Sequence, residues 1–238
     1  MRVMVIGAGY WGSILIDRLI PLVGKENLIV ADINPAPLQG RYGVHCTVNW
    51  TPNLPLVDAV VIATPIATHE EIAKACLMAG KHVLVEKPMS FTYTGARSLT
   101  ALAQKAGVVL RTDLTFLHRW SQVELMDVQS FIWTGPASRH KEDGILWTWG
   151  PHPVSLMLMA MGVSPFAVEG SLSKNAAILD YSFPDRSITV EMRWGAGIPK
   201  GRHALFEAGP ATSLDEWGDP EREPVTLMLK SWLNDIEQ

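Results

Sequence analysis

His152 lies in a stretch of sequence whose residue types could support acid–base chemistry. The stretch is GILWTWGPHPVS, residues 144–155, in which the histidine stands between two prolines and follows two tryptophans. A histidine can move a proton near neutral pH, but a catalytic histidine usually needs an orienting partner. No carboxylate follows until Glu169. His152 is therefore a working acid–base residue, the remnant of one, or a packed ring.

A second chemical signal is the glycine pattern GAGYWG near the N-terminus. It places Gly7, Gly9 and Gly12 in a G-x-G-x-x-G spacing that follows an apolar run and opens a helical pattern. The first glycine permits a tight turn, the second lets the backbone approach a pyrophosphate, and the third lets helix and strand pack closely. The first helical turn, with Tyr10 and Trp11, would direct N–H groups at the anion. This pattern predicts a dinucleotide site, and the alternative is that the glycines only shape a turn.

Asp32 ends the second apolar run, about twenty residues beyond the glycine loop, as a dinucleotide fingerprint requires. A carboxylate there accepts hydrogen bonds from both ribose hydroxyls and repels a 2′-phosphate. We therefore expect NAD(H) to be preferred over NADP(H). The alternative is that Asp32 only caps the turn DINP.

The elements that must position these residues alternate between strand and helix in the first half of the chain. Apolar runs typical of buried parallel strands end near the glycine loop, Asp32 and Pro65. Pro21 is expected to stop the first helix, and Thr68 and Gly80 to cap a later one. Strands are expected at 2–9, 27–35, 58–65, 82–88 and 108–116, and helices at 10–22, 68–81 and 92–107.

The pattern changes near residue 118. An apolar helix is expected at 152–162, and strands at 123–135, 166–174, 176–183 and 187–194. In the last strand, Thr189, Glu191 and Arg193 alternate with apolar residues, which is typical of a half-buried strand. The fold class is therefore α/β: a doubly wound parallel sheet of the Rossmann type over residues 1–117, then a small α+β domain with a mostly antiparallel open sheet over 118–238. An amphipathic helix is expected at 224–237.

The composition excludes several classes of protein. The chain has 238 residues, 47% of them hydrophobic, and a net charge of −4, which is typical of a globular protein with no nucleic-acid partner. Its two cysteines have no metal-type spacing and favour a reduced compartment. The N-terminal apolar run is too short for a signal peptide, and no later run is long enough to span a membrane. We expect a cytoplasmic protein without a metal.

One long stretch, ATPIATHEEIAKACLMAGKHVLVEKPMSFT at 63–92, resembles the Gfo/Idh/MocA family of NAD(P)-dependent oxidoreductases. The resemblance is dense from residue 2 to about 119, and it thins beyond that point. Its motifs are GAGYWG, ATP at 63–65, His69, AGKHVLVEKP at 79–88, and LHRW at 117–120.

The resemblance implies roles for residues of the first half. The family's EKP lysine, here Lys87, reaches toward the substrate and the nicotinamide, with Glu86 beside it. Pro88 fixes the backbone and could follow a cis peptide. The cofactor crevice would be lined by Ala63, Thr64, Pro65, His69, Glu86 and Lys87.

The second half departs from the family pattern D-x-G-x-H-x-x-D. Gly150 and His152 match its core, but Thr148 and Ser155 stand where the two acids belong. Loss of the carboxylates puts alcohol oxidation in doubt, because a base must take the hydroxyl proton as the hydride leaves. Thr148 could orient His152 more weakly. The chain is also shorter than family members, whose C-terminal segment folds back on the dinucleotide domain, so a pared-down substrate domain is expected.

Other residues could contact a substrate. His118 and Arg119 follow the last strand of the first domain, where they could bind an anion or a hydroxyl, or form a surface ion pair. Trp149, like Trp147, could stack on a sugar or simply pack in the core. The expected substrate-binding set is His118, Arg119, Thr148 and Trp149.

The sequence favours an NAD(H)-dependent oxidoreductase that acts on a small polar metabolite: a sugar, a sugar nucleotide or a related cyclic compound. Lys87 would exchange the proton, and His152 would hydrogen-bond the reacting oxygen. An imine or enone reductase is an alternative, because it needs only one proton donor. A subunit that binds nucleotide without turnover is another. The resemblance also implies a homo-oligomer, a dimer or tetramer formed through the C-terminal sheet.

Overall fold

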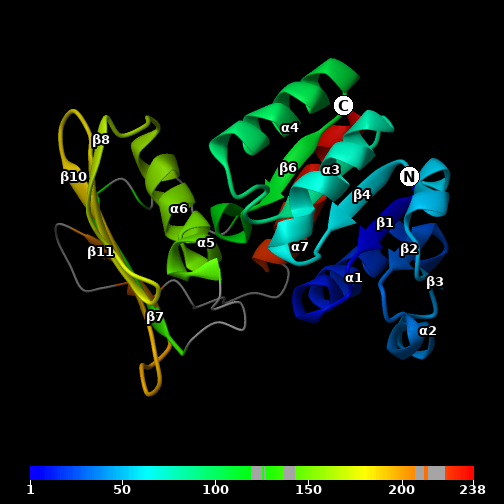
Figure 1. Ribbon diagram of the computed structural model, residues 1–238, viewed down its shortest axis with the longest axis horizontal. Helices are drawn as coiled ribbons and strands as arrows, with labels where there is room; N and C mark the ends of the chain where they lie inside the picture. Colours follow the sequence, from blue (N-terminus) through cyan, green and yellow to red (C-terminus); the bar gives the residue numbers. More distant parts are fainter. Residues whose placement is uncertain (119–124, 126, 137–142, 207–211, 214–222) are drawn as a thin grey trace. The chain divides into compact units, whose positions relative to one another are not determined.

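The computed structural model describes residues 1–118, 125, 127–136, 143–206, 212–213 and 223–238 (Figure 1). These residues form two compact units. One comprises Met1–Asp113 together with Val225–Gln238, and the other comprises Leu114–Pro224. None of the described helices is both long and apolar enough to cross a lipid bilayer.

The first unit is built on a six-stranded parallel sheet in the order β3-β2-β1-β4-β5-β6. Continuous apolar runs form its centre: all four residues of β1 and all four of β4 are buried. The strand order reverses between β1 and β4, as in a doubly wound sheet. The strands are β1 (Val3–Ile6), β2 (Leu28–Ala31), β3 (His45–Thr47), β4 (Ala59–Ile62), β5 (His82–Glu86) and β6 (Leu110–Asp113).

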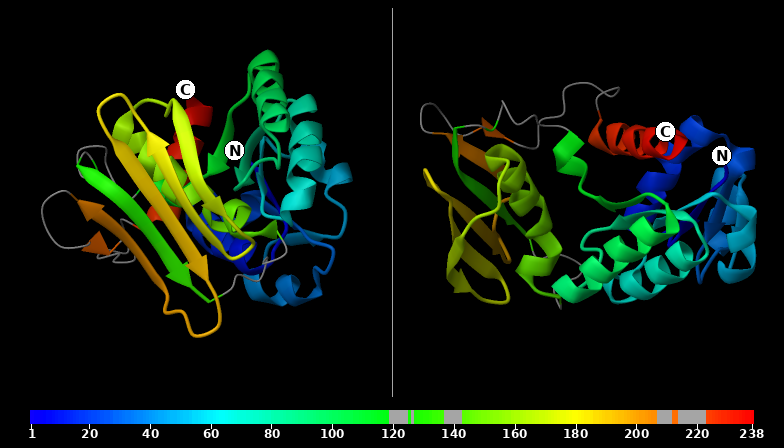
Figure 2. Two further views of the ribbon diagram at one scale, coloured as in Figure 1. Left: turned by 60° about the vertical axis from the view of Figure 1, so that its left-hand side comes forward. Right: turned by 90° about the horizontal axis from the view of Figure 1, so that it is seen from above.

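Alternate strand residues point to opposite sides of this sheet, and both sets are apolar. Helices therefore cover both faces. Val3 and Val5 pack with α1 (Tyr10–Val23) and α7 (Pro224–Glu237), and Met4 and Ile6 pack with α3 (His69–Met78) and α4 (Tyr93–Ala106). The right-hand view of Figure 2 shows the two helical layers with the sheet between them. A short helix, α2 (Ala36–Tyr42), and turns of 3₁₀ helix at Lys25–Asn27, Thr51–Leu56 and Ile66–Thr68 complete the unit.

One expected helix stop is wrong, and one expected N-cap lies at the expected residue but lacks the side-chain capping bond. Pro21 lies inside α1, which continues to Val23 and ends at Gly24 with φ of 83°. A proline near the end of a helix removes only one N–H and need not stop it at once. Thr68 precedes α3, but its hydroxyl donates to the carbonyl of Pro65 at 2.7 Å instead of capping the helix. At the other end of α3, Gly80 does follow the helix with φ of 69°.

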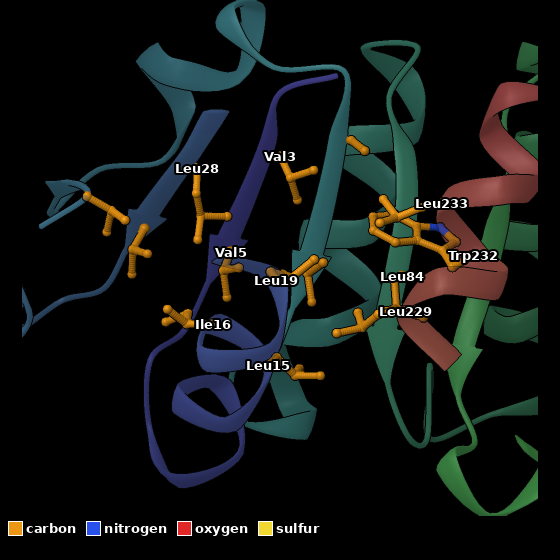
Figure 3. Packing of buried hydrophobic residues seen from close by; sticks show 14 of the residues in the cluster. Val3, Val5, Leu15, Ile16, Leu19, Leu28, Leu84, Leu229, Trp232 and Leu233 are labelled. Carbon is orange, nitrogen blue, oxygen red and sulfur yellow. The ribbon is translucent and has the colours of Figure 1, made fainter. Parts of the chain in front are cut away.

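The last helix, α7, belongs to the first unit, which corrects the assignment of all of 118–238 to the second domain. Met228, Leu229 and Trp232 are at most 1% exposed and pack into the same core as β1 and α1. Figure 3 shows Trp232 beside Leu84 of β5. The C-terminal segment therefore folds back on the dinucleotide-binding unit after all.

The second unit is a six-stranded open sheet in the order β12-β11-β7-β10-β9-β8, with α5 (Ile145–Trp149) and α6 (Pro151–Met161) packed against it. Among the described strands of this second sheet, only β7 and β10 pair in parallel. The predicted α/β class, with a parallel sheet followed by a mostly antiparallel one, is confirmed. The strands are β7 (Val128–Gly135), β8 (Ala167–Leu172), β9 (Ala176–Ser182), β10 (Ser187–Trp194), β11 (Gly201–Phe206) and β12 (Thr212–Ser213).

Candidate functional site

The glycine loop joins β1 to α1, and each of its three glycines has a different steric environment. Gly7 has φ of 90°, and a Cβ there would lie 2.6 Å from the carbonyl oxygen of Ala63. A Cβ at Gly12 would overlap the carbonyl oxygen of Gly7. A Cβ at Gly9 would meet none of the described atoms within 4 Å. Gly7 and Gly12 are therefore needed for close packing, whereas Gly9 faces open space that a ligand can enter.

Asp32 follows β2 and is tied to the glycine loop. The N–H of Ala8 donates to its Oδ2 at 2.7 Å, and the N–H of Asn34 donates to its Oδ1 at 2.8 Å. The second bond is the turn-capping contact of the alternative interpretation. Each carboxylate oxygen has a further lone pair, so these bonds leave acceptor capacity for ribose hydroxyls. The capping role and the ribose-binding role are therefore compatible.

The expected cofactor residues come together at the carboxyl ends of neighbouring strands. The glycine loop follows β1, Asp32 follows β2, Ala63–Pro65 follow β4, and Lys87 follows β5. Parallel strands place these ends at one edge of the sheet, and a ligand is expected where the strand order reverses. The helix N-terminus, the open space at Gly9 and the carboxylate of Asp32 fit the pyrophosphate and ribose of a dinucleotide.

His69 is the expected cofactor residue whose position differs from the expectation. Its side chain is 2% exposed, and its ring nitrogens face protein carbonyls: Nδ1 lies 2.9 Å from O of Pro88, and Nε2 lies 2.8 Å from O of Thr64. Burial lowers the pKa of His69, and the two carbonyl contacts oppose this shift. His69 therefore links the segments after β4 and β5 from within the protein, with both ring nitrogens directed at backbone carbonyls.

Lys87 follows β5, and its peptide bond to Pro88 is cis, as the EKP motif suggested. The Lys87 side chain is partly buried. Glu86 precedes it at the last position of β5. Burial raises the pKa of the Glu86 carboxyl well above its usual range, and the charge of Asp113 raises it further, while Lys87 opposes the shift.

Asp113 is a residue of this site that sequence reasoning missed. It is 1% exposed, pairs in register with Glu86 across β5 and β6, and accepts a hydrogen bond from Nε1 of Trp11 at 2.7 Å. The sequence signal that could have revealed Asp113 was the position of its carboxylate. Asp113 ends the strand that follows the EKP strand, and neighbouring parallel strands in such folds often follow each other in sequence.

His152 lies in the first turn of α6 in the second unit. Its ring packs edge-on against Phe116, with centroids 5.0 Å apart, and stacks parallel to Trp133 at 6.4 Å. Phe116 and Trp133 belong to the core of the unit, and the guanidinium of Arg202 lies over both rings. The packed-ring interpretation therefore has direct structural support.

Thr148 and Ser155 stand where the family pattern has its two acids, and each hydroxyl donates a hydrogen bond to a nearby backbone carbonyl. The hydroxyl of Thr148 donates to the carbonyl of Gly144 at 2.9 Å, so it can face another group only as an acceptor. The hydroxyl of Ser155 donates to the carbonyl of His152 at 2.8 Å. Neither arrangement replaces a carboxylate.

The other expected substrate residues are placed as follows. Trp149 packs edge-on against Trp194 with centroids 5.4 Å apart, which favours its role in the core. His118 ends a 3₁₀ turn, Thr115–His118, and is partly buried. Arg119 lies outside the described residues. Among the described residues, no three histidine, cysteine or acidic side chains are grouped as metal ligands would be.

Comparison with known proteins agrees with this architecture. The family model described as "Oxidoreductase family, NAD-binding Rossmann fold" matches residues 1–114. The uncharacterized oxidoreductase YdgJ of Escherichia coli (strain K12) is 37% identical over 258 residues, which cover 94% of this chain and 73% of that protein. A 4-carboxy-2-hydroxymuconate-6-semialdehyde dehydrogenase of Sphingobium sp. (strain NBRC 103272 / SYK-6) is 29% identical over 225 residues, covering 82% of this chain and 70% of that protein.

Among solved structures, GenD2 from gentamicin A biosynthesis, in complex with NAD, superposes with a TM-score of 0.82. It is 21% identical, and the match covers 99% of this chain and 86% of that one. At this level of identity the likeness concerns the fold. The sequence matches go further: the chain belongs to the Gfo/Idh/MocA family of oxidoreductases and carries its NAD-binding Rossmann fold.

Proposed function

We propose that this oxidoreductase uses NAD(H) in preference to NADP(H), and that it acts on a small polar metabolite of the sugar, sugar-nucleotide or related cyclic class. The observation that carries the cofactor preference is the carboxylate of Asp32 at the end of β2, fastened to the glycine loop through the N–H of Ala8. A fixed negative charge at the ribose position repels a 2′-phosphate and accepts hydrogen bonds from ribose hydroxyls.

In this proposal, each residue has a role that its position in the fold supports. Backbone groups of Gly9, Tyr10 and Trp11 bind the pyrophosphate at the start of α1, and Asp32 orients the ribose. When bound, the nicotinamide supplies or accepts the hydride. Lys87 gives a proton to the substrate oxygen during reduction and takes it back during oxidation. Ala63, Thr64 and Pro65 line the crevice.

The part of His152 in this proposal is a hydrogen bond to the reacting oxygen. The ring of His152 packs against Phe116 and Trp133, so its position is explained without a hydrogen bond to a substrate. This observation favours a second candidate function. Reduction of a polarised C=N or C=C bond requires a single proton donor, which Lys87 provides. The activities of the wild type and of a His152→Gln variant on alcohols and ketones separate the two candidate functions. The second candidate predicts that neither the wild type nor the variant uses these substrates.

The test of the cofactor preference is calorimetric titration with NADH and NADPH of the wild type and of Asp32→Asn. The amide keeps the shape of the side chain and removes its charge. We expect the wild type to prefer NADH and the variant to lose about tenfold or more of that preference, which corresponds to about 1.4 kcal/mol. Asp185→Asn, at an exposed position in the second unit, is the matched control. Equal binding of both cofactors by the wild type would refute the preference.

Two glycine variants test the pyrophosphate site. Gly9→Ala adds a methyl group where the described structure is open, so the variant should fold normally and bind NADH at least tenfold more weakly. Gly12→Ala adds the same group against the carbonyl of Gly7, so it should lose stability as well. Undiminished NADH binding by Gly9→Ala would place the cofactor elsewhere.

The turnover and assembly proposals have their own measurements. Oxidation of bound NADH in a single turnover, with a panel of sugars, ketones, imines and enones, distinguishes an enzyme from a subunit that binds nucleotide without turnover.

The homo-oligomer, a dimer or tetramer formed through the sheet of the second unit, is tested by light scattering coupled to size-exclusion chromatography. A monomer at all concentrations would remove that part of the proposal.

A further inference from the structure

The carboxyl pair Glu86 and Asp113 has no part in the proposed reaction, although it adjoins Lys87. The two residues are partners in register on neighbouring parallel strands, at the last position of β5 and of β6. Strands lie about 4.8 Å apart, and partners in register project to the same face. Asp113 is 1% exposed, so water does little to screen the pair.

Asp113 is buried and Glu86 is partly buried, and two carboxyl groups on neighbouring strands cannot both ionise at low cost, so this arrangement favours one proton held between them. The structure indicates which carboxyl group holds it. Nε1 of Trp11 donates to Oδ2 of Asp113 at 2.7 Å, and an N–H donor stabilises the charged form of the acceptor. The pKa of Glu86 is raised by burial and then by Asp113, which is consistent with a protonated Glu86.

We propose that Glu86 and Asp113 share a single proton, with the charge on Asp113, and that the pair is a positioning unit for Lys87. This inference rests on the proposed role of Lys87 in proton transfer. Asp113 touches neither the cofactor nor a substrate in this proposal. It acts through Glu86, the chain neighbour of Lys87, and through Trp11, which belongs to the first turn of α1.

The shared proton sets the charge next to Lys87. The charged groups that act on the Glu86 carboxyl, among the described residues, are Asp113 from β6 and Lys87 from the end of β5, while α1 contributes the uncharged indole of Trp11. With one proton, the pair carries one negative charge and balances a lysine ammonium. With none, it would carry two, so the net charge beside Lys87 changes by one unit when the shared proton is lost.

The first test is a carbon-13 NMR titration of side-chain carboxyl groups in the cofactor-free protein, with Glu86→Gln used to assign the signal. We expect Glu86 to titrate well above the usual range for a glutamate. In Asp113→Asn, which keeps an acceptor for Trp11, the midpoint should fall by about one pH unit or more, a tenfold loss of proton affinity. A wild-type midpoint in the ordinary range, or an unchanged midpoint in the variant, would overturn the shared proton.

Trp11→Phe provides a second variant that leaves both carboxyl groups in place. Loss of the indole donor should move the proton toward Asp113, so the Glu86 signal should shift toward the carboxylate position and the Asp113 signal toward the acid position. Signals that do not move would remove Trp11 from the proposal.

The positioning role is tested by the pH profile of NADH-dependent reduction of a substrate taken from the turnover panel. One limb of kcat/KM should follow the NMR midpoint and shift by the same amount in Asp113→Asn. A limb that stays in place would reduce the pair to a structural feature. Failure of the wild type to bind NADH would refute the proposed function, yet would leave the cofactor-free titration valid, so the two failures are distinguishable.

Discussion

Arg111, in the edge strand β6, forms an ion pair with Asp235 of the last helix, α7. The same guanidinium donates to the hydroxyl of Ser231 at 2.9 Å, one turn earlier on α7. These contacts fasten the C-terminal helix to the edge of the parallel sheet, while its apolar side enters the core. The last helix is therefore packed and bonded as part of the same unit as the N-terminal strands.

The Arg111–Asp235 pair itself should contribute little to stability. Its side chains are 35% and 32% exposed, and partly exposed ion pairs contribute about 0.2–1 kcal/mol. A double-mutant cycle with Arg111→Gln and Asp235→Asn, measured by urea unfolding, should give a coupling free energy within that range. A coupling well above it would mean that the pair, and not apolar packing, holds α7 in place.

Packing of Trp232 should matter much more. Its ring is fully buried, and its Nε1 has no hydrogen-bond partner among the described residues. Trp232→Ala should lower the free energy of unfolding by about 3–5 kcal/mol, because it leaves a large cavity. Trp232→Phe should cost much less, since it also removes an unsatisfied buried donor. Lys230→Ala, on the exposed side of α7, is the control. Equal losses for the two Trp232 variants would indicate a bonded indole N–H.

Lys87→Ala tests proton transfer. The variant should lower kcat by about 10²-fold or more, as expected for loss of a general acid–base group. NADH affinity should change much less, because the glycine loop and Asp32 are untouched. Lys105→Ala, at an exposed position of α4, should behave like the wild type. Normal turnover by Lys87→Ala would exclude this lysine from the mechanism.

Cys76 should be unreactive in the folded protein. It is fully buried, and burial raises the pKa of its thiol to about 12, so almost no thiolate is present near neutral pH. Iodoacetamide labelling followed by mass spectrometry should modify Cys76 only in denaturant, with Cys46, which is partly buried, as the internal comparison. Rapid native labelling of Cys76 would show that the α3 layer opens readily.

His69 should make stability depend on pH on the acid side. Burial lowers its pKa below the usual 6.5, so the folded protein binds fewer protons there than the unfolded chain does. Stability should therefore fall as the pH drops below about 6.5, down to the lowered pKa, and should be flat above that range. The melting temperature of His69→Gln should depend less on pH between about 7.5 and 5.5, and the exposed His45→Gln should retain the wild-type dependence. Identical profiles for the wild type and His69→Gln would contradict the shift.

Local patterns determined much of this protein. Continuous apolar runs specified the buried parallel strands, because both faces of such a sheet are covered. Period-two alternation in 187–194 specified β10, whose apolar residues are all buried. The glycine loop could be placed from sequence because spacing and context act together, and Gly7 and Gly12 have the close contacts that the spacing implied.

Tertiary structure decided what depends on contacts between distant segments. An amphipathic helix at 224–237 can bury its apolar side against either unit, and only the folded chain shows that it joins β1 and α1. Likewise, a histidine at the start of α3 carries no sign that both ring nitrogens will face backbone carbonyls. Asp113 meets Trp11 across 102 positions of sequence. Local spacing fixes periodicity and backbone conformation, whereas burial and the pairing of charges arise only when the strands are assembled.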